Sequence, residues 1–475
     1  MDKKIASNFI YNFIYQFLTI ALPIVTVPYI SRVLGPQGVG EYNYVNSIVS
    51  YFGIFAVLGT VAYGQREIAR QQFSKEKKDK KFSEIFLFRI ITTSIVFCIY
   101  SIFILLYKNN YYNLFLANYF LVFSWALDVS WYFQGVENFR VTAVRNGLVK
   151  IIATISVFIF VKGSNDTLKY MLIYTLSTLL GNLTMFPFLK GEVKLVRVKL
   201  YEFIIVLKGS LIFFVPVIAI QIFNTLNKVM LGITGQTKQV GYYSQAVQIL
   251  NLCVGLIYAL SSVLLPRLSY LYAENEIDKM KKYMYIGIKN TCLMGLPMCI
   301  GCLLIADIFV PVFFGSGYQP VIPILYVLCP LFVVIGIGQL LGVYLLSVNR
   351  QWQNTLAVVL AVIINIIGNY IVLFFNMKAY GVAVITLITE ATSTIIQMIA
   401  MKDYISFDVY IRSIKNYVFP CLLMSLVVFI IRFSLSSNIT SLLLSILGSV
   451  IIYLGYLLWR KDEFIYSLFA SLFHR

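Results

Sequence analysis

The chain contains little of what catalysis in water requires. Of its 475 residues only 12% are charged, and its single histidine is His474. Acid–base catalysis by histidine, Ser-His-Asp chemistry and His-ligated metals are therefore excluded or nearly so. The sequence has no G-x-x-x-x-G-K-S/T loop, and the polar segments between its apolar runs are too short for a soluble nucleotide-binding or catalytic domain. We expect a protein that is not an enzyme.

Cysteines are also few. The seven of them lie in or beside apolar runs, which argues against a disulfide framework. Cys299 and Cys302 form a C-x-x-C, but it has no second pair, so chance is favoured over metal or redox chemistry. No cleavable signal peptide is recognisable, and the first apolar segment should remain as a membrane span. We expect no cofactor; coupling to the membrane potential, H⁺ or Na⁺ stays open.

Apolar residues, in contrast, make up 60% of the chain. They recur in runs of about 20 residues, the length that a transmembrane helix needs. These runs predict an all-α polytopic membrane protein with about 14 spans. The predicted spans lie near residues 9–30, 42–63, 85–107, 112–133, 141–161, 168–189, 209–233, 240–265, 286–309, 321–345, 354–375, 379–401, 416–433 and 439–459.

The basic residues predict the orientation. If the N-terminus is cytoplasmic, most of the 38 Lys and Arg residues lie in inside loops. Those that fall in outside loops are Arg32, Lys108, Lys162, Lys169, Lys238, Lys378 and Arg432. This bias predicts a multi-pass protein of the plasma membrane with both termini in the cytoplasm.

The formal net charge of +18 is dispersed over many short loops, so we expect contact with anionic membrane lipids and none with nucleic acid. The run SKEKKDKK, Ser74 to Lys81, is interpreted as a topology signal on a solvated loop, with a dedicated lipid-binding patch as the alternative.

One glycine-rich interruption occurs twice. RVLGPQGVGEYNY begins at Arg32, and KVMLGITGQTKQVGYYSQAVQIL begins at Lys228. Both have a basic residue, a glycine turn and Val-Gly followed by aromatics. A tight turn between two spans is favoured over a phosphate cradle for the first copy. Pro23 and Pro216 precede the two copies within the membrane.

This weak repeat of six spans predicts two lobes related by an axis along the membrane normal. The expected domains are an N-lobe (1–190), a cytoplasmic linker (191–208), a C-lobe (209–402), two further spans (403–459) and a cytoplasmic interfacial tail (460–475). The tail places Phe464, Ile465, Leu468, Phe469, Leu472 and Phe473 on one helical face.

Several stretches together resemble a known family. They are SRVLGPQGVGEYNY, GTVAYGQREIAR, LDVSWYFQGVENF, LLPRLS and GVAVITLITE. The chain resembles Wzx-type flippases of O-antigen or capsule repeat units, in the superfamily that also contains the MATE drug antiporters. The resemblance implies a V-shaped two-lobed fold and export of undecaprenyl-diphosphate-linked oligosaccharide by alternating access, for cell-surface polysaccharide synthesis. Polysaccharide polymerase and other synthesis proteins are the implied partners.

Charged residues within spans are costly and usually face a polar cavity. Because arginine and lysine bind phosphate, our candidates for binding the diphosphate as it crosses the membrane are Arg32, Arg66, Arg89 and Lys228. The candidates for ion coupling or charge pairing are Asp128, Glu390 and Lys150. Snorkelling at a span end is the alternative for Lys150, and pairing with Arg89 or Lys150 is the alternative for Asp128.

Aromatic rings can stack on sugars, so Tyr42, Tyr44 and Tyr243 are candidates for contacting the glycan, whereas Trp131 is interpreted as an interfacial anchor. The alternative function is a MATE-like drug or cation antiporter, which should have a more acidic cavity. A membrane glycosyltransferase or polymerase should have a long outer loop with catalytic carboxylates, and the outer loops here are short.

Overall fold

The structure is a computed structural model that describes residues 3–71, 73–108, 110–262, 264–435, 438–462 and 464–466. Every regular element of this part of the chain is a helix. Two compact units are present, Met1–Gly241 and Tyr242–Arg475, and each is described by itself. Residues 467–475, which include His474 and most of the predicted interfacial tail, lie outside the described residues.

The all-helical membrane class is confirmed, but the number of fourteen spans is not. Within the described ranges, 11 helices are long and apolar enough to cross a membrane, or 12 if the bent pair α14 (Val321–Leu328) and α15 (Leu331–Ser347) is one span. One cause of the difference is that the first two predicted spans form one helix, α1 (Lys3–Val57).

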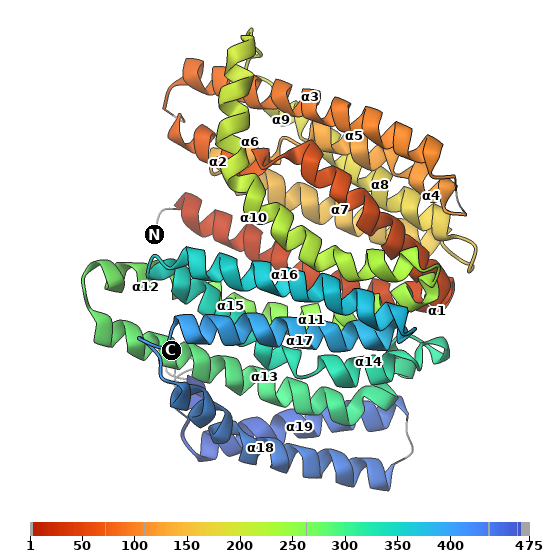
Figure 1. The fold of residues 1–475 in the computed structure, drawn as a ribbon, viewed down its shortest axis with the longest axis vertical. Coiled ribbons are helices and arrows are strands. Elements are labelled where there is room, and N and C mark those ends of the chain that lie inside the picture. Colours follow the sequence, from red (N-terminus) through yellow and green to blue (C-terminus); the bar gives the residue numbers. More distant parts are fainter. Residues whose placement is uncertain are drawn as a thin grey trace. The chain divides into compact units, whose positions relative to one another are not determined.

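Helix α1 consists of two arms that meet at Gly35. This residue has φ 66° and ψ 179°, a conformation that only glycine adopts readily, and Pro36 then opens the second arm, where its missing N–H costs little. The predicted turn at GPQGVG is therefore a break of a single residue. Figure 1 shows both arms in red. Pro23 lies inside the first arm, whereas the side chain of Pro216 lies outside the described part of the structure.

The first unit packs around α1. Its other helices are α2 (Thr60–Arg70), α3 (Lys75–Leu106), α4 (Tyr112–Ala117), α5 (Tyr119–Leu127), α6 (Ser130–Gly135), α7 (Phe139–Phe160), α8 (Thr167–Leu183), α9 (Phe186–Leu189) and α10 (Leu200–Ile233). Helix α1 contacts α3, α7 and α10, while α5 packs between α3 and α8. A buried cluster under α2, α3 and α6 contains Tyr63, Phe82 and Trp131.

Helix α10 differs from the prediction, which placed it at the start of the second lobe. The structure groups it with the first unit, where it packs against α1, α2 and α3. The closest approach is at Gly232, because a Cβ there would lie 1.9 Å from Cδ2 of the buried Tyr44 ring. A glycine is required at such a contact, and it fixes the C-terminal end of α10 against the second arm of α1.

The linker before α10 is fastened to the basic run at the start of α3. Lys80 Nζ lies 2.7 Å from Glu202 Oε1, and Lys78 Nζ lies 4.0 Å from Glu192 Oε2. The backbone N–H of Val196 donates to Ser83 Oγ at 2.9 Å. The carboxylates thus neutralise part of the run, which favours a structural role for it over a lipid-binding patch.

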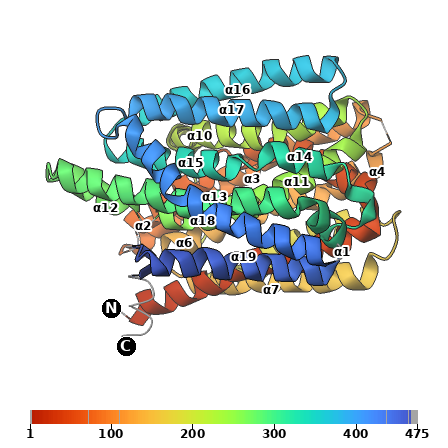
Figure 2. The same ribbon diagram turned by 90° about the horizontal axis from the view of Figure 1, so that it is seen from below.

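The second unit contains the remaining long helices. They are α11 (Thr237–Ser262), whose first residues belong to the first unit, α12 (Leu264–Ala273), α13 (Ile277–Phe313), α14, α15, α16 (Gln351–Phe374), α17 (Lys378–Ala400), α18 (Phe407–Ser434) and α19 (Ile439–Trp459). Figures 1 and 2 show α16 beside α17, and these two helices pack along their length. The core lies among α12, α13, α15, α18 and α19.

Helix α19 binds two carbonyl groups that prolines leave free. Pro297 in α13 has no N–H for the carbonyl of Leu293, and the Tyr453 hydroxyl donates to that oxygen at 2.7 Å. Pro420 in α18 frees the carbonyl of Asn416 in the same way, and Arg460, directly after α19, donates to it at 3.0 Å. Both freed carbonyl oxygens thereby accept a hydrogen bond from a side chain.

Two ion pairs secure the same three helices at opposite ends. Arg432 at the end of α18 donates to Asp307 of α13 at 2.5 Å, and Lys289 of α13 lies 3.2 Å from Asp462, which follows α19. Helices α13, α18 and α19 are therefore joined at both ends and in the middle.

Candidate functional site

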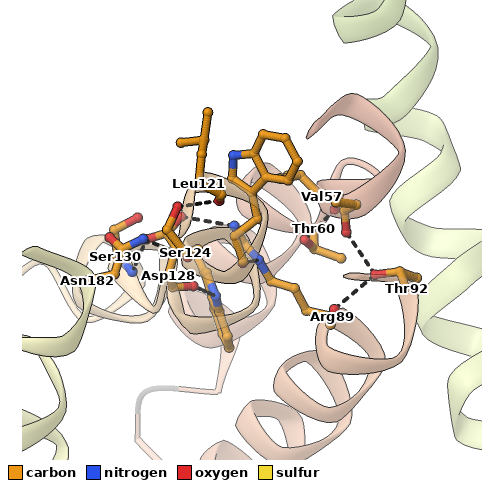
Figure 3. A network of polar contacts seen from close by, with 12 residues as sticks. Val57, Thr60, Arg89, Thr92, Leu121, Ser124, Asp128, Ser130 and Asn182 are labelled. Carbon is orange, nitrogen blue, oxygen red and sulfur yellow. Dashed lines mark hydrogen bonds and ion pairs between the residues drawn. The ribbon is translucent and has the colours of Figure 1, made fainter. Parts of the chain in front are cut away.

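Arg89 and Asp128 form a buried ion pair in the first unit. Arg89 is 1% exposed, and its Nη2 donates to Asp128 Oδ2 at 3.0 Å while its Nε donates to the carbonyl oxygen of Trp125 at 2.6 Å. The other carboxylate oxygen of Asp128 accepts from the backbone N–H of Ser130 at 3.0 Å. Figure 3 shows the pair at the end of α5. The expected alternative for Asp128, pairing with Arg89, matches this geometry.

The pair stabilises a break in a membrane helix. Helix α5 ends at Leu127, Asp128 is extended (φ −77°, ψ 111°), and α6 begins at Ser130. The last carbonyls of a helix lack intrahelical partners and attract positive charge. Arg89 binds one of these carbonyls, and Asn182 of α8 donates to another, that of Ser124, at 2.7 Å.

The two most specific sequence motifs pack against each other. GTVAYGQREIAR forms α2, and LDVSWYFQGVENF contains the break and α6, which contacts α2. At the contact, a Cβ on Gly64 would lie 2.5 Å from the Trp131 ring. Trp131 is fully buried and stacks on Phe82 at 5.4 Å. Its predicted role as an interfacial anchor is wrong, because the indole belongs to the core.

Arg66 lies on α2 and remains partly accessible. Its side chain is 38% exposed, and its Nη2 lies 2.9 Å from Glu67 Oε1. The guanidinium also lies over the Tyr63 ring at 5.5 Å and the Phe213 ring at 5.0 Å. Arg32, at the end of the first arm of α1, is exposed. Arg66 and Arg89 therefore have different partners and form no shared cluster.

Lys228 lies beside the repeated motif. It is half-buried on α10, and its Nζ donates to Asn43 Oδ1 at 3.4 Å, a long contact with a neutral amide. Asn43 was not predicted from the sequence. Its place between two candidate tyrosines in the motif was the available signal. The structure thus brings the lysine of the second copy of the motif to the aromatic end of the first copy.

The candidate tyrosines differ in accessibility. Tyr42 is half-buried and packs against Tyr170 and Tyr174 of α8, with ring centroids 4.6 and 5.9 Å away. Tyr44 is 1% exposed, and its hydroxyl lies 3.0 Å from that of Tyr107. Tyr243, in the second unit, is 3% exposed with its hydroxyl 3.0 Å from Thr386 Oγ1. Of the three candidate tyrosines, only Tyr42 is therefore partly exposed in this conformation.

The two copies of the motif meet at their Val-Gly pairs. A Cβ on Gly40 would lie 1.8 Å from the carbonyl oxygen of Thr237, and one on Gly241 would lie 2.1 Å from that of Pro36. Gln37 adds a hydrogen bond of 2.8 Å to Thr237 Oγ1. The glycines in corresponding positions of the repeat thus make equivalent close contacts with backbone carbonyls, which explains why each copy has a glycine at this position.

The remaining candidates lie apart. Lys150 on α7 is half-buried, with its Nζ 5.3 Å from the centroid of the Tyr15 ring. Glu390 on α17 is half-buried, and no hydrogen bond or ion pair joins it to another described residue. Among the residues searched in the described part of the chain, no three His, Cys, Asp or Glu side chains gather where a metal would bind.

Comparison with known proteins identifies the family. The model of a family described as polysaccharide biosynthesis protein matches residues 5–272, more than half of the chain. The chain belongs to this family. Among curated proteins, this polysaccharide biosynthesis protein is 23% identical over 404 residues to a putative O-antigen transporter of Escherichia coli K12, covering 83% of the chain and 96% of that protein.

A second relative, a probable low-salt glycan biosynthesis flippase of Haloferax volcanii, is 22% identical over 245 residues, or 52% of the chain and 51% of that protein. Among solved structures, the lipid II flippase MurJ in an inward closed conformation matches 98% of the chain and 100% of its own, with a TM-score of 0.73 and 16% identity. An inward-facing MATE multidrug transporter matches 85% of the chain and 96% of its own, with a TM-score of 0.64 and 16% identity. These likenesses show the fold that the polysaccharide biosynthesis protein adopts.

Proposed function

We propose that this multi-pass membrane protein is a flippase that exports undecaprenyl-diphosphate-linked oligosaccharide across the plasma membrane, for cell-surface polysaccharide synthesis. One observation carries the proposal: the alignment with the putative O-antigen transporter extends over 96% of that protein, within a family of polysaccharide biosynthesis proteins. The helical fold agrees with it. Lipid-linked glycan and membrane lipids are the ligands it implies, and polymerase and other synthesis proteins are the partners.

The charges in the first unit support a pathway for an anionic substrate. Among the described residues, Lys228 has one long hydrogen bond, to Asn43, and Arg32 is exposed, so both can exchange their present surroundings for a phosphate. Arg66 is accessible beside Glu67. Arg89 has a carboxylate and a carbonyl as partners and is fully buried, so we assign it to the helix break and not to the substrate. Tyr42 is our remaining candidate for stacking on a sugar.

Energetics favour a charge-driven cycle. Moving two negative charges outward through an inside-negative potential releases about 5 kcal/mol per 100 mV, from roughly 2.3 kcal/mol per charge. With both termini in the cytoplasm, as the loop charges predict, the membrane potential alone is sufficient to drive export. H⁺ or Na⁺ coupling through Glu390 is then an addition and not a requirement.

The test uses purified protein in liposomes with a fluorescent undecaprenyl-diphosphate oligosaccharide in the leaflet that corresponds to the cytoplasm. We expect translocation that accelerates when a potential is imposed in the export direction, and a slower rate for Lys228→Met. Protein-free liposomes and the Lys77→Met variant, which changes an exposed lysine outside the candidate residues, serve as controls. Absence of translocation together with ion-coupled efflux of a cationic dye would overturn the proposal in favour of an antiporter of the same fold.

A further inference from the structure

A cavity with several charged lining residues lies at one end of the second unit, outside the residues discussed so far. Its volume is about 540 Å³, and its lining includes Lys281, Lys282, Tyr285, Lys402, Asp403 and Tyr404. The two neighbouring lysines are in the second turn of α13, and Lys402 follows the end of α17. Three exposed lysines from two separate segments thus line one cavity.

The side chains of these three lysines make no hydrogen bond or ion pair with another described residue. Lys279, one turn earlier in α13, is different because it pairs with Glu276 at 2.7 Å. In the SKEKKDKK run, Lys80 and Lys81 each bind a carboxylate, whereas Lys77 is exposed and has no ion pair with a described residue. The site is distinguished by the gathering of three such lysines, from two segments, around one cavity.

The one carboxylate of the lining is already engaged. Arg350 Nη2 donates to Asp403 Oδ2 at 2.8 Å, and its guanidinium also lies 5.2 Å from the Tyr404 ring centroid. Asp403 is thus neutralised from outside the lysine cluster. The cavity keeps an excess of positive charge, with two tyrosine rings beside it, which suits a compact anion with several acceptor oxygens.

The position of the cavity points to the membrane surface. Helices α13, α17 and α18 are each long and apolar enough to cross a membrane, and the cavity lies where α13 and α18 begin and α17 ends. The Lys and Arg distribution predicts that this end is cytoplasmic. Phe407 and Ile411 continue along α18 from the cavity and are 65% and 38% exposed. A phosphate in the cavity can therefore carry acyl chains that lie along α18.

We propose that the cavity of Lys281, Lys282 and Lys402 is a phosphate-binding site at the membrane surface, separate from the transport pathway. The shared chemistry is a phosphate group, presented either by an anionic phospholipid or by a solute. The site does not depend on the proposed function, because it is defined by residues of the second unit alone.

The experiment measures binding to the purified full-length protein in neutral detergent. Phosphatidylglycerol is titrated as the anionic lipid and phosphatidylcholine as its neutral counterpart, and native mass spectrometry reports the bound lipids. Inorganic phosphate is titrated separately, with the thermal unfolding midpoint as readout, because a ligand of the folded state raises it. The test variant is K281Q/K282Q/K402Q.

Two further variants make the result interpretable. K77Q/K190Q/K194Q removes the same charge from exposed lysines that lie at the predicted cytoplasmic side of the first unit and have no ion pair. It controls for general attraction between a basic protein and an anionic lipid. K281R/K282R/K402R keeps the charge and should bind as the wild type does, which separates loss of the site from loss of the fold.

We expect the affinity for phosphatidylglycerol to fall by about tenfold or more in the glutamine variant of the cavity, and to change little in the matched control. This outcome assigns the site to a lipid. Loss of the phosphate-induced rise in the unfolding midpoint, with unchanged lipid binding, assigns it to a solute. Equal weakening in both glutamine variants, or no difference from the wild type in either titration, overturns the proposal.

Discussion

Arg89 and Lys228 are both cations of the first unit that the sequence placed inside membrane spans, and the structure treats them differently. Arg89 is 1% exposed and holds a carboxylate and a carbonyl at 3.0 and 2.6 Å. Lys228 is half-buried with one contact of 3.4 Å to an amide. A charge within a membrane span indicates transport only when its partners are weak enough to be exchanged; Arg89 has a structural role instead.

The same difference separates two acids. Asp128 binds Arg89 and the backbone of Ser130, whereas Glu390 has no partner among the described residues. The paired acid completes a helix break. The unpaired acid is a candidate for binding a coupling ion, because no described residue pairs with its charge.

The largest expected effect concerns the buried pair. Arg89→Met should lower the free energy of unfolding by about 3 to 5 kcal/mol, because it leaves Asp128 without its counter-charge and the carbonyl of Trp125 without its donor. The measurement is the unfolding midpoint in detergent and the yield of monodisperse protein. Arg89→Met/Asp128→Asn should recover part of the loss. A single variant as stable as the wild type would show that the pair does not hold the break.

The second largest effect is expected at the contact of α10 with α1. Gly232→Ala places a Cβ 1.9 Å from the Tyr44 ring, one helical turn from Lys228, and should cost about 1 to 3 kcal/mol through overpacking. Thermal unfolding measures the cost. The matched control is Gly255→Ala on α11, where nothing lies within 4 Å. Equal stability of the two variants would contradict the close packing of α10 in the first unit.

A substitution of Lys228 should change stability little and the export rate strongly. Lys228→Met removes only one long hydrogen bond, so we expect a change in stability below about 1 kcal/mol. The export rate in liposomes should fall about tenfold or more, since a phosphate-binding charge is lost, and Lys228→Arg should retain most of it. An unchanged rate in Lys228→Met would remove Lys228 from the proposed pathway.

Glu390→Gln tests the unpaired acid. Because the potential alone is sufficient for export of a dianion, we expect the rate under an imposed potential to stay within about twofold of the wild type. The rate is compared with and without a proton or sodium gradient. A variant that flips normally in all conditions excludes Glu390 from ion coupling, and a loss of about tenfold would establish that coupling is obligatory.

The smallest effect concerns an exposed ion pair between α7 and α8. Asp166 lies 2.7 Å from Lys169 and accepts from the backbone N–H groups of Lys162 and Gly163, interactions that lower its pKa to about 2. The stability that a depressed folded-state pKa contributes is present above the ordinary value and is lost as the pH falls from that value, about 4, to about 2. The difference in unfolding midpoint between wild type and Asp166→Asn should therefore stay small and constant from about pH 7 to pH 5 and shrink below about pH 4. A difference that stays constant down to about pH 2 would show that the pKa of Asp166 is not depressed.

The sequence predicted the helical membrane class because long apolar runs leave few alternatives. The number of fourteen spans stays a prediction, since Gly35 interrupts α1 without forming a loop and the two arms are counted as one helix. The division of the chain depended on contacts. Helix α10 follows a linker that resembles a lobe boundary, yet the fit of Gly232 under Tyr44 holds it to the first unit. Such a fit depends on residues far apart in the chain and leaves no periodic signal.

The candidate site was predicted in part. Residue type was sufficient to select Lys228 and Arg66 as accessible cations. Pairing of Asp128 with Arg89 could be named as an alternative, because opposite charges in one membrane region tend to pair. Burial could not be predicted for Tyr44 and Tyr243, because aromatic residues suit both the core and a binding surface. Asn43 was missed because its one available signal, its place between two candidate tyrosines, does not identify an uncharged amide as the partner of a lysine 185 residues away.

Helix α19 has a consequence for the mechanics of the second unit. Prolines usually act as joints, because the carbonyl that they free lets a helix bend. Here Tyr453 and Arg460 donate hydrogen bonds to the freed carbonyl oxygens of α13 and α18. Each hydrogen bond opposes a change of the helix angle at its proline. The last two long helices, α18 and α19, therefore hold α13 at a fixed angle. An antibody fragment that binds α18 and α19 would restrict any bending of α13.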